Sequence, residues 1–307
     1  MGLRMSVRPL IAGALACALA APSSAGPLAP HPGATRNIAA ACAGRDGWAD
    51  PAPPARLYGN TWYVGTCGIT ALLVETNAGL VLIDGGVPAA APLVLENIRR
   101  LGFSPRLVRW ILVSHEHYDH AGALPAIQRE TGARAIAGPY QLAPLQSGRA
   151  DAKDPQAALL AKEPMQPLKI DRVMQNGMRL TVGGTSFTAT ATPAHSPGST
   201  SWTWRACEGG VCRTIAYADS ASTISADDYR FTDHPDRVAA VRTGLAAIAN
   251  LPCDIIATPH PSGSDLLDRM SNKGLLVQYG ACRRYAEAAK QRFAQRLASE
   301  AGAKPAK

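Results

Sequence analysis

The sequence contains no run of five or six like charges, although Lys and Arg outnumber Asp and Glu by 31 to 23. A nucleic-acid groove concentrates its cations on one face, so this dispersed excess of +8 indicates no nucleic-acid partner. The chain also lacks an internal repeat, which argues against a solenoid. Beyond the N-terminus no segment offers about 18 uninterrupted apolar residues, so we expect no membrane anchor. The 307 residues, 47% of them hydrophobic, suffice for a substantial core.

Residues 1–25 have the pattern of a secretory signal peptide. Arg4 and Arg8 precede an uncharged apolar run at 10–21, and the small residues Ser23 and Ala25 follow it. A basic start, a short apolar core and a small-x-small exit are typical of a segment that is removed on export. We therefore predict cleavage after Ala25 and a periplasmic product that forms one domain from residue 26 to residue 307.

The sequence has no C-x-x-C pair, which argues against a thiolate metal site. One of the seven cysteines, Cys17, lies in the predicted signal peptide. An even number of the others in an exported protein predicts disulfides, although the residues alone leave the pairing open. Cys207 and Cys212 flank a turn between two strand-like runs, so a bridge across that hairpin is expected. The remaining candidates are Cys42, Cys67, Cys253 and Cys282.

Strand-like and helical patterns alternate along the chain. The expected strands are 61–64, 69–75, 80–83, 107–113, 168–173, 178–182, 186–191, 201–205, 213–217 and 254–257. The expected helices are 88–101, 121–131, 235–250 and 275–301. Residues 138–167, rich in Pro, Gln and Gly, predict a long surface loop with at most one short helix.

Two halves of the chain, about 55–165 and 166–307, each run from strands to helices. This order favours an α/β fold, a four-layer αβ/βα sandwich with two mixed sheets face to face and helices outside. The order of elements alone also permits a single mixed sheet with flanking helices.

Five of the seven histidines follow strand-like runs, in three places. The first place is the motif H-x-H-x-D-H at residues 115–120. In an extended segment the side chains at i and i+2 point the same way, so its first two histidines can bind one ion together. Imidazole and carboxylate suit Zn²⁺, and the set is large enough for two ions with positions left open. The candidate ligands are His115, His117, Asp119, His120, His195 and His260, whereas His31 and His234 are interpreted as ordinary polar residues.

These motifs resemble those of the metallo-β-lactamase fold hydrolases, and within them the subclass B3 metallo-β-lactamases. Besides H-x-H-x-D-H, the similar segments are A-T-P-A-H-S-P-G-S-T at 191–200, T-P-H-P at 258–261 and V-L-I-D-G-G at 81–86. The resemblance covers nearly all of the mature chain. It implies two Zn²⁺ ions, the first bound by His115, His117 and His195 and the second by Asp119, His120 and His260.

The resemblance also implies roles around these ligands. Asp84 would orient the segment that carries the first ligands, or else only form a turn before two glycines. Ser220 and Ser222 would hydrogen-bond the substrate carboxylate, because this subclass has serine where other β-lactamase subclasses have a zinc-binding cysteine. Tyr229 would help to hold the carbonyl oxygen. For these three residues ordinary loop polarity is the alternative.

One neighbouring residue could point to another activity. Asp219 lies near the position of an aspartate that bridges both metals in glyoxalase II-type and lactonase-type relatives. If Asp219 turns away from the metals, Ser220 faces the substrate instead, and this is the arrangement we expect.

The disulfides that the resemblance implies are Cys42–Cys67, Cys207–Cys212 and Cys253–Cys282.

The implied activity is hydrolysis of the β-lactam amide bond of penicillins, cephalosporins and carbapenems, which confers antibiotic resistance. The nucleophile would be a metal-bound hydroxide that Asp119 orients. The substrate would lie between the 138–167 loop and the loop at 62–68, with Gln146 as a contact. We expect a monomer whose partner is this small molecule. The alternatives are an exported hydrolase of the same fold that acts on a lactone or thioester, and a non-catalytic zinc-binding protein.

Overall fold

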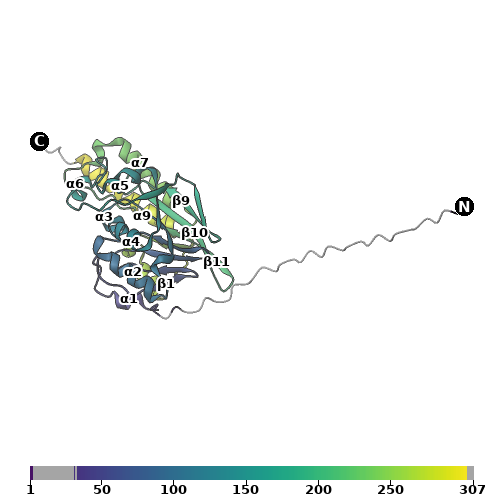
Figure 1. The fold of residues 1–307 in the computed structure, drawn as a ribbon. Helices are drawn as coiled ribbons and strands as arrows, with labels where there is room; N and C mark the ends of the chain where they lie inside the picture. The colour runs from purple at the N-terminus through teal and green to yellow at the C-terminus, as the bar shows by residue number, and fades with distance from the viewer. Residues whose placement is uncertain (3–30, 32, 303–307) are drawn as a thin grey trace.

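The computed structural model describes residues 1–2, 31 and 33–302. Residues 3–25 of the predicted signal peptide lie outside this range. Figure 1 shows strands stacked between two groups of helices. Among the described helices, none is long and apolar enough to cross a membrane.

The first sheet has seven strands that follow one another in chain order, antiparallel from β1 to β4 and parallel from β4 to β7. They are β1 Ala55–Tyr58, β2 Thr61–Tyr63, β3 Leu72–Thr76, β4 Gly79–Ile83, β5 Val108–Leu112, β6 Arg134–Ala137 and β7 Ile170–Val173. The second sheet has five strands in the order β12-β11-β10-β9-β8, parallel only between β11 and β12. They are β8 Arg179–Val182, β9 Thr185–Ala191, β10 Thr200–Glu208, β11 Val211–Tyr217 and β12 Ile255–Ala257.

The longer helices are α2 Ala91–Arg100, α4 Leu124–Thr131, α7 Pro235–Ala249 and α9 Ala281–Gly302. The short ones are α1 Ile38–Ala41, α3 Tyr118–Ala121, α5 Leu142–Ser147, α6 Ala157–Leu160 and α8 Leu266–Met270. Five 3₁₀ turns complete the described elements: η1 Pro88–Ala90, η2 Pro105–Leu107, η3 Pro139–Gln141, η4 Phe231–Asp233 and η5 Pro261–Ser264.

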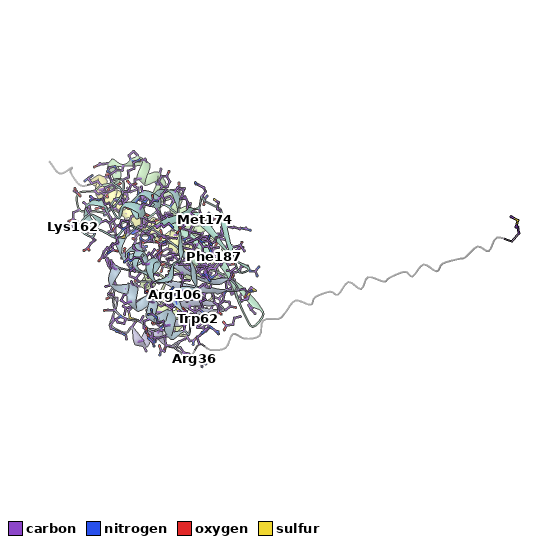
Figure 2. The ribbon with its side chains drawn as sticks, viewed as in Figure 1. Arg36, Trp62, Arg106, Lys162, Met174 and Phe187 are labelled. Atoms are coloured by element: carbon purple, nitrogen blue, oxygen red, sulfur yellow. A yellow bond between two sulfur atoms is a disulfide. The ribbon has the colours of Figure 1, made fainter. Side chains whose placement is uncertain are left out.

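Three hydrophobic cores separate the layers. The central core lies between the two sheets and includes Leu72 of β3 and Phe187 of β9. A second core, which includes Trp62, packs the first sheet against α2 and α4. A third packs the second sheet against α7 and α9. Trp62 and Phe187 are labelled in Figure 2. The predicted four-layer αβ/βα sandwich is therefore confirmed, and the alternative of a single mixed sheet is wrong.

Several details of the predicted elements need correction. β7 lies beyond the expected boundary at residue 165 yet joins the first sheet. The 138–167 segment contains two short α-helices, α5 and α6, where at most one was expected. Pro144 is tolerated in α5 because it sits in the first turn, where a missing N–H costs nothing. α9 begins six residues later than expected, after Gly280 adopts φ +73°. β1 and β6 were not predicted.

All three expected disulfides are present. Cys207 and Cys212 are directly paired across the β10–β11 hairpin. Cys42–Cys67 ties the N-terminal segment to the loop after β2. Cys253–Cys282 ties the start of α9 to the segment before β12. Each bridge therefore fixes a segment at the margin of the sandwich.

Two tryptophans of β10 link the sheets by hydrogen bonds through the central core. The indole N–H of Trp202 donates to the carbonyl oxygen of Val113, after β5, at 3.0 Å. The indole N–H of Trp204 donates to Oγ1 of Thr61 in β2 at 3.1 Å. Trp202, Trp204 and Thr61 are fully buried, so neither indole could find water as a substitute partner.

We expect Trp204→Phe to lower the free energy of unfolding by about 2 kcal/mol, because it leaves the Thr61 hydroxyl without its donor and opens a small cavity. Urea unfolding of the oxidised protein would measure this change. Trp48→Phe is the control, because Trp48 is half exposed and should change stability by less than about 0.5 kcal/mol. Equal losses in both variants would contradict the cross-sheet role.

Candidate metal centre

The predicted ligands gather at one edge of the sandwich. The H-x-H-x-D-H segment follows β5, His195 follows β9, and His260 follows β12. Residues 219–222 leave the end of β11 at the same edge. Since these strands belong to both sheets, each sheet contributes loops to one place, as is general for sites in α/β folds.

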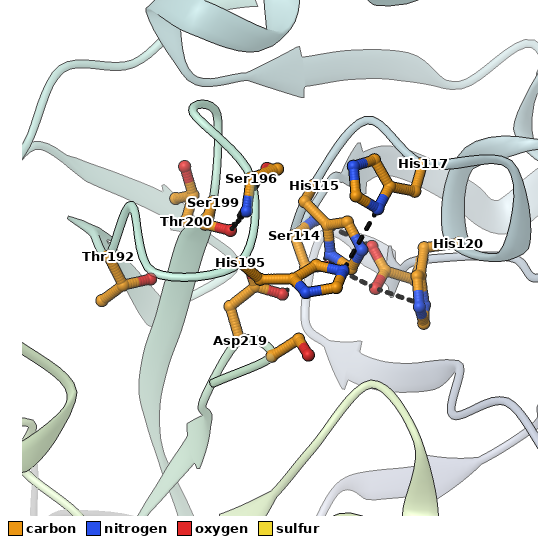
Figure 3. A network of polar contacts seen from close by, with 12 residues as sticks. Ser114, His115, His117, His120, Thr192, His195, Ser196, Ser199, Thr200 and Asp219 are labelled. Atoms are coloured by element: carbon orange, nitrogen blue, oxygen red, sulfur yellow. Dashed lines mark hydrogen bonds and ion pairs between the residues drawn. The ribbon is translucent and has the colours of Figure 1, made fainter. Parts of the chain in front are cut away.

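The first cluster of ligand atoms comes from His115, His117 and His195. One nitrogen of each lies within 4.8 Å of the others, and all three side chains are buried. Figure 3 shows the imidazoles converging, with a dashed line between His117 and His195. Nδ1 of His117 lies 3.1 Å from Nε2 of His195. Two nitrogens on one tetrahedral Zn²⁺ would lie about 3.3–3.4 Å apart, so this spacing fits one shared ion.

The outer nitrogen of each imidazole is hydrogen-bonded. Nδ1 of His115 donates to Asp219 at 2.9 Å, and Nε2 of His117 donates to Asp154 at 2.8 Å. Nδ1 of His195 faces the hydroxyl and the carbonyl oxygen of Ser222 at 2.9 and 3.0 Å. With these outer N–H groups engaged, the inner nitrogens of the three imidazoles, when neutral, direct their lone pairs toward one another.

Nε2 of His115 adds an independent sign that these residues fit a metal ion. Within the described part of the chain, this atom is buried and has no hydrogen-bond partner. A buried nitrogen left without a partner is costly unless something binds it. The donor set of three imidazoles is one that Zn²⁺ uses in catalytic sites.

A second cluster lies next to the first. Oδ2 of Asp119 is 3.1 Å from Nε2 of His120 and 3.1 Å from Nε2 of His260. The ligand atoms of His115, Asp119 and His120 lie within 4.8 Å of one another, so the two clusters adjoin at His115. Burial opposes ionisation of Asp119, but His120 and His260 outweigh it and hold the pKa of this carboxyl well below its usual range. The carboxylate is therefore charged and able to bind a cation.

Asp84 holds the backbone just before His115 in place. Its Oδ1 accepts a hydrogen bond from the Ser114 N–H at 2.8 Å, and its Oδ2 accepts from the Ser114 hydroxyl at 2.6 Å and the Tyr217 hydroxyl at 2.8 Å. Oδ2 also lies 3.8 Å from Nδ1 of His120. Asp84 has φ +58°, so it forms a tight turn as well. Asp84 therefore contacts Ser114, the residue before His115, and also forms a turn.

The electrostatics of the first cluster differ between its members. Burial lowers the pKa of His115 to about 4, although the charge of Asp219 opposes this. Burial also lowers the pKa of His195 well below its ordinary value, and the charges of His117 and His115 add to the shift. Burial acts against protonation of His117 too, but the hydrogen bond and charge of Asp154 raise its pKa to about 9. A metal ion would therefore displace a proton from His117.

Sequence reasoning missed the residues that hold the ligand loops together. Glu116, inside the motif but given no role, accepts hydrogen bonds from Ser196 and Gly198, and a Cβ at Gly198 would come within 2.3 Å of its carboxylate. Nε2 of Gln141 donates to the carbonyl oxygens of Ser114 and Gly198 at 2.7 and 2.9 Å. These residues fix the His115 and His195 loops to each other, and no local pattern marks Gln141 for this role.

Two further polar residues support the ligand loops from outside the motifs. Asp154 lies in the 138–167 segment and binds His117, as described above. The guanidinium of Arg237, on α7, donates to the carbonyl oxygens of Pro193 and Ala194 at 2.7 and 2.9 Å. Both side chains are buried. Their sequence neighbours carry no motif, so only the folded arrangement reveals them.

A cavity of about 920 Å³ opens above the two clusters. His117, Asp119, His195 and His260 line its floor, and Ser220 and Ser222 line one side. The two serine hydroxyls lie 3.1 Å apart. The structure therefore brings the predicted serines and the predicted ligands to one cavity of a size typical for small-molecule sites.

Other predicted contacts do not reach this cavity. Gln146 is exposed on α5, outside the cavity lining, and Gln156 lies there instead, with its amide nitrogen 3.3 Å from Nε2 of His195. Tyr229 is also outside the lining, because its ring stacks on His234 at 4.4 Å. Trp62, at the start of the expected 62–68 loop, is buried in a strand, and Trp48 lines the cavity in place of that loop.

Asp219 is turned toward the outer nitrogen of His115 and is fully buried. The imidazole of His115 thus separates the bonded carboxylate oxygen from the inner nitrogen Nε2. Ser220, the next residue, lines the cavity. This is the arrangement expected if Asp219 does not bridge two metals.

Comparison with known proteins agrees with this geometry. The family model of the metallo-β-lactamase superfamily matches residues 64–209. The solved metallo-β-lactamase MIM-1 from Novosphingobium pentaromativorans is 57% identical, with a TM-score of 0.85 over 87% of this chain and 99% of that one. The chain belongs to the metallo-β-lactamase superfamily.

Two more solved members of this family support the assignment. MEM-A1, a subclass B3 metallo-β-lactamase from a soil metagenome library, is 37% identical, with a TM-score of 0.79 over 84% of this chain and 100% of that one. The metallo-β-lactamase SMB-1 is 40% identical, with a TM-score of 0.79 over 83% and 99% of the two chains. Both align with this chain along nearly their whole length, and the match to MEM-A1 places the chain in subclass B3.

We expect Asp154→Asn to weaken zinc binding about tenfold, because it removes the charged acceptor that orients His117. Competition with a chromophoric chelator at fixed pH would measure the affinity. Asp151→Asn is the matched control: its carboxylate accepts from the backbone N–H of Lys153 in the same segment, and no histidine contact is found for it among the described residues. Unchanged affinity in Asp154→Asn would show that His117 needs no such partner.

Proposed function

We propose that this protein is a zinc-dependent β-lactamase that hydrolyses the amide bond of penicillins, cephalosporins and carbapenems and so confers antibiotic resistance. The observation that carries this proposal is the convergence of two imidazole and carboxylate clusters on the floor of the cavity that Ser220 and Ser222 line. The ligands proposed for one Zn²⁺ are His115, His117 and His195, and those proposed for a second are Asp119, His120 and His260.

Zinc bound at these residues would polarise the lactam carbonyl and lower the pKa of a water molecule toward neutrality. The protein itself contributes by orienting the zinc ligands. Asp219, Asp154 and Ser222 hold the outer nitrogens of the histidines and thereby fix where the lone pairs point. Rigid ligands of this kind need no reorganisation during the reaction.

Asp119 is positioned to orient the attacking water. One of its oxygens, Oδ2, faces His120 and His260, and the residue lines the cavity. We assign to its other oxygen, Oδ1, the task of accepting a hydrogen bond from the attacking water and so orienting it. Tyr229 lies outside the cavity lining, so we do not assign it the carbonyl oxygen.

The serine pair is suited to the substrate carboxylate. The Ser220 hydroxyl has the Ser222 hydroxyl as its neighbour at 3.1 Å, and both can turn a proton toward an anion in the cavity. Trp48, Leu159 and Ile224 supply apolar surface around the same space. A polar anchor within a mostly apolar wall is the general form of a small-molecule site.

The disulfides support a periplasmic location for this enzyme. Three bridges within one chain favour an oxidising environment. Together with the signal-like residues 1–25, they support a periplasmic enzyme. We propose that it acts as a monomer on a small-molecule substrate.

The decisive test is resistance in a susceptible bacterium that expresses and exports the full chain. We expect the minimal inhibitory concentration of a carbapenem to rise, and a zinc chelator to reverse the rise. His117→Ala, exported to the same level by immunoblot, should lose at least about a hundredfold of the purified activity. Zinc-loaded, well-exported protein that gives no resistance and hydrolyses no β-lactam would defeat the proposal.

Ser220→Ala tests the role of the serine pair. We expect KM for β-lactams to rise about tenfold with kcat nearly unchanged, because one hydrogen bond to a carboxylate is lost. Steady-state kinetics of the zinc-loaded protein would measure both constants. Ser147→Ala is the control, because Ser147 lies at the exposed end of α5. A fall in kcat without a change in KM would argue against carboxylate binding at Ser220.

A further inference from the structure

One wall of the cavity is a face of α9 that carries positive charge. The α9 residues that line the cavity recur at positions i, i+3, i+4, i+7 and i+11, as expected for one helical face: Ala281, Arg284, Tyr285, Ala288 and Arg292. The wall therefore carries two guanidinium groups with a tyrosine between them. Neither arginine has a place among the proposed zinc ligands or their hydrogen-bond partners.

This face lies beside the serine pair. The backbone N–H of Ala221, between Ser220 and Ser222, donates to the hydroxyl of Tyr285 at 2.9 Å. Tyr285 and Arg292 both line the cavity from α9, so this hydrogen bond places the arginine-bearing face of the helix against the loop that carries the two serines.

The two arginines are not neutralised by nearby carboxylates. Across residues 33–302, no carboxylate comes within ion-pair distance of Arg284 or Arg292. Arg284 donates one hydrogen bond to the carbonyl oxygen of Tyr279, which fixes its position and leaves other donors free. Besides Asp119, the carboxylates that line the cavity are Glu163 and Asp265, both exposed.

A guanidinium is well matched to small planar or tetrahedral anions. It presents several N–H donors in a fixed plane, which suits carboxylate and sulfonate groups. A cavity of about 920 Å³ fits a small molecule rather than a macromolecule. The ligand for this wall should therefore be an anionic group on the substrate itself.

We propose that Arg284 and Arg292 form a second anion subsite, which selects β-lactams that carry a second carboxylate or sulfonate besides the ring carboxylate. This inference rests on the proposed function and names a substrate class for the same cavity. Ser220 and Ser222 would hold the ring carboxylate, and the α9 face would hold the second anionic group on a substituent. The arginines are specificity residues and take no part in the bond cleavage.

The test compares two cephalosporins that differ only in whether the 3-substituent ends in a neutral group or a carboxylate. For the doubly charged compound, Arg292→Gln and Arg284→Gln should each raise KM about threefold, and the double variant about tenfold. KM for the singly charged compound should change by less than about twofold, with kcat unaffected. The difference between the compounds should shrink at high salt.

Arg283→Gln is the matched control. Arg283 is the neighbour of Arg284 in α9, is also exposed, and faces the groove between α7 and α9 instead of the cavity. This variant makes the same change in net charge, so it should leave the ratio of the two KM values as in the unmodified protein. A ratio that shifts equally in Arg283→Gln would mean that only the overall charge matters, and it would overturn the subsite.

Failure of this inference is distinct from failure of the proposed function. If the unmodified protein hydrolyses both compounds and the arginine variants do not change the ratio of the two KM values, the subsite is wrong while the β-lactamase activity stands. If it hydrolyses neither, the activity is what fails. Calorimetric binding of the two compounds in their ring-opened form then still tests the subsite. Tighter binding of the compound whose 3-substituent ends in a carboxylate, lost in the double variant, supports the subsite. Equal binding of the two compounds refutes it.

Discussion

The structure depends above all on three hydrogen bonds to the outer nitrogens of His115, His117 and His195. An imidazole has one proton to place when neutral, and an acceptor at one nitrogen leaves the lone pair at the other. Here the acceptors are Asp154 of the 138–167 segment and Asp219 and Ser222 after β11, each distant in sequence from the histidine it contacts. The inner nitrogens face one another only because these distant residues are in place, so the site is a consequence of the whole fold.

The sandwich provides the rigidity for this arrangement. Trp202 of the second sheet bonds to Val113, two residues before His115, and Gln141 bonds to Ser114 between them. The backbone that presents His115 is thus held by both the opposite sheet and the segment after β6. Such close packing around a polar cluster compensates for burying several ionisable groups in one small volume.

The sequence allowed prediction of whatever follows from local spacing. Alternating and continuous apolar runs predicted most of the strands, and H-x-H-x-D-H predicted a metal centre, because short-range order fixes both. The distant residues that hold each ligand loop in place could not be predicted from local spacing. Asp154 and Arg237 act through contacts 37 and 43 residues away in sequence, and nothing near them marks their roles. Gln146 was predicted to contact the substrate, but Gln156 lines the cavity instead. The 138–167 segment folds into two helices, and Gln146 on the first of them is exposed.

This contrast separates two kinds of information in the chain. The ligand atoms come from short motifs at strand ends, where a change of one residue removes a ligand. Much of the cavity wall comes from the 138–167 segment and from one face of α9, where no metal-binding motif constrains the side chains. Chains that share the same ligands can therefore differ in the charge and shape of these walls. The chemistry of hydrolysis would then stay constant, while the choice of substrate would follow from residues such as Arg284 and Arg292, which only the folded arrangement brings to the cavity.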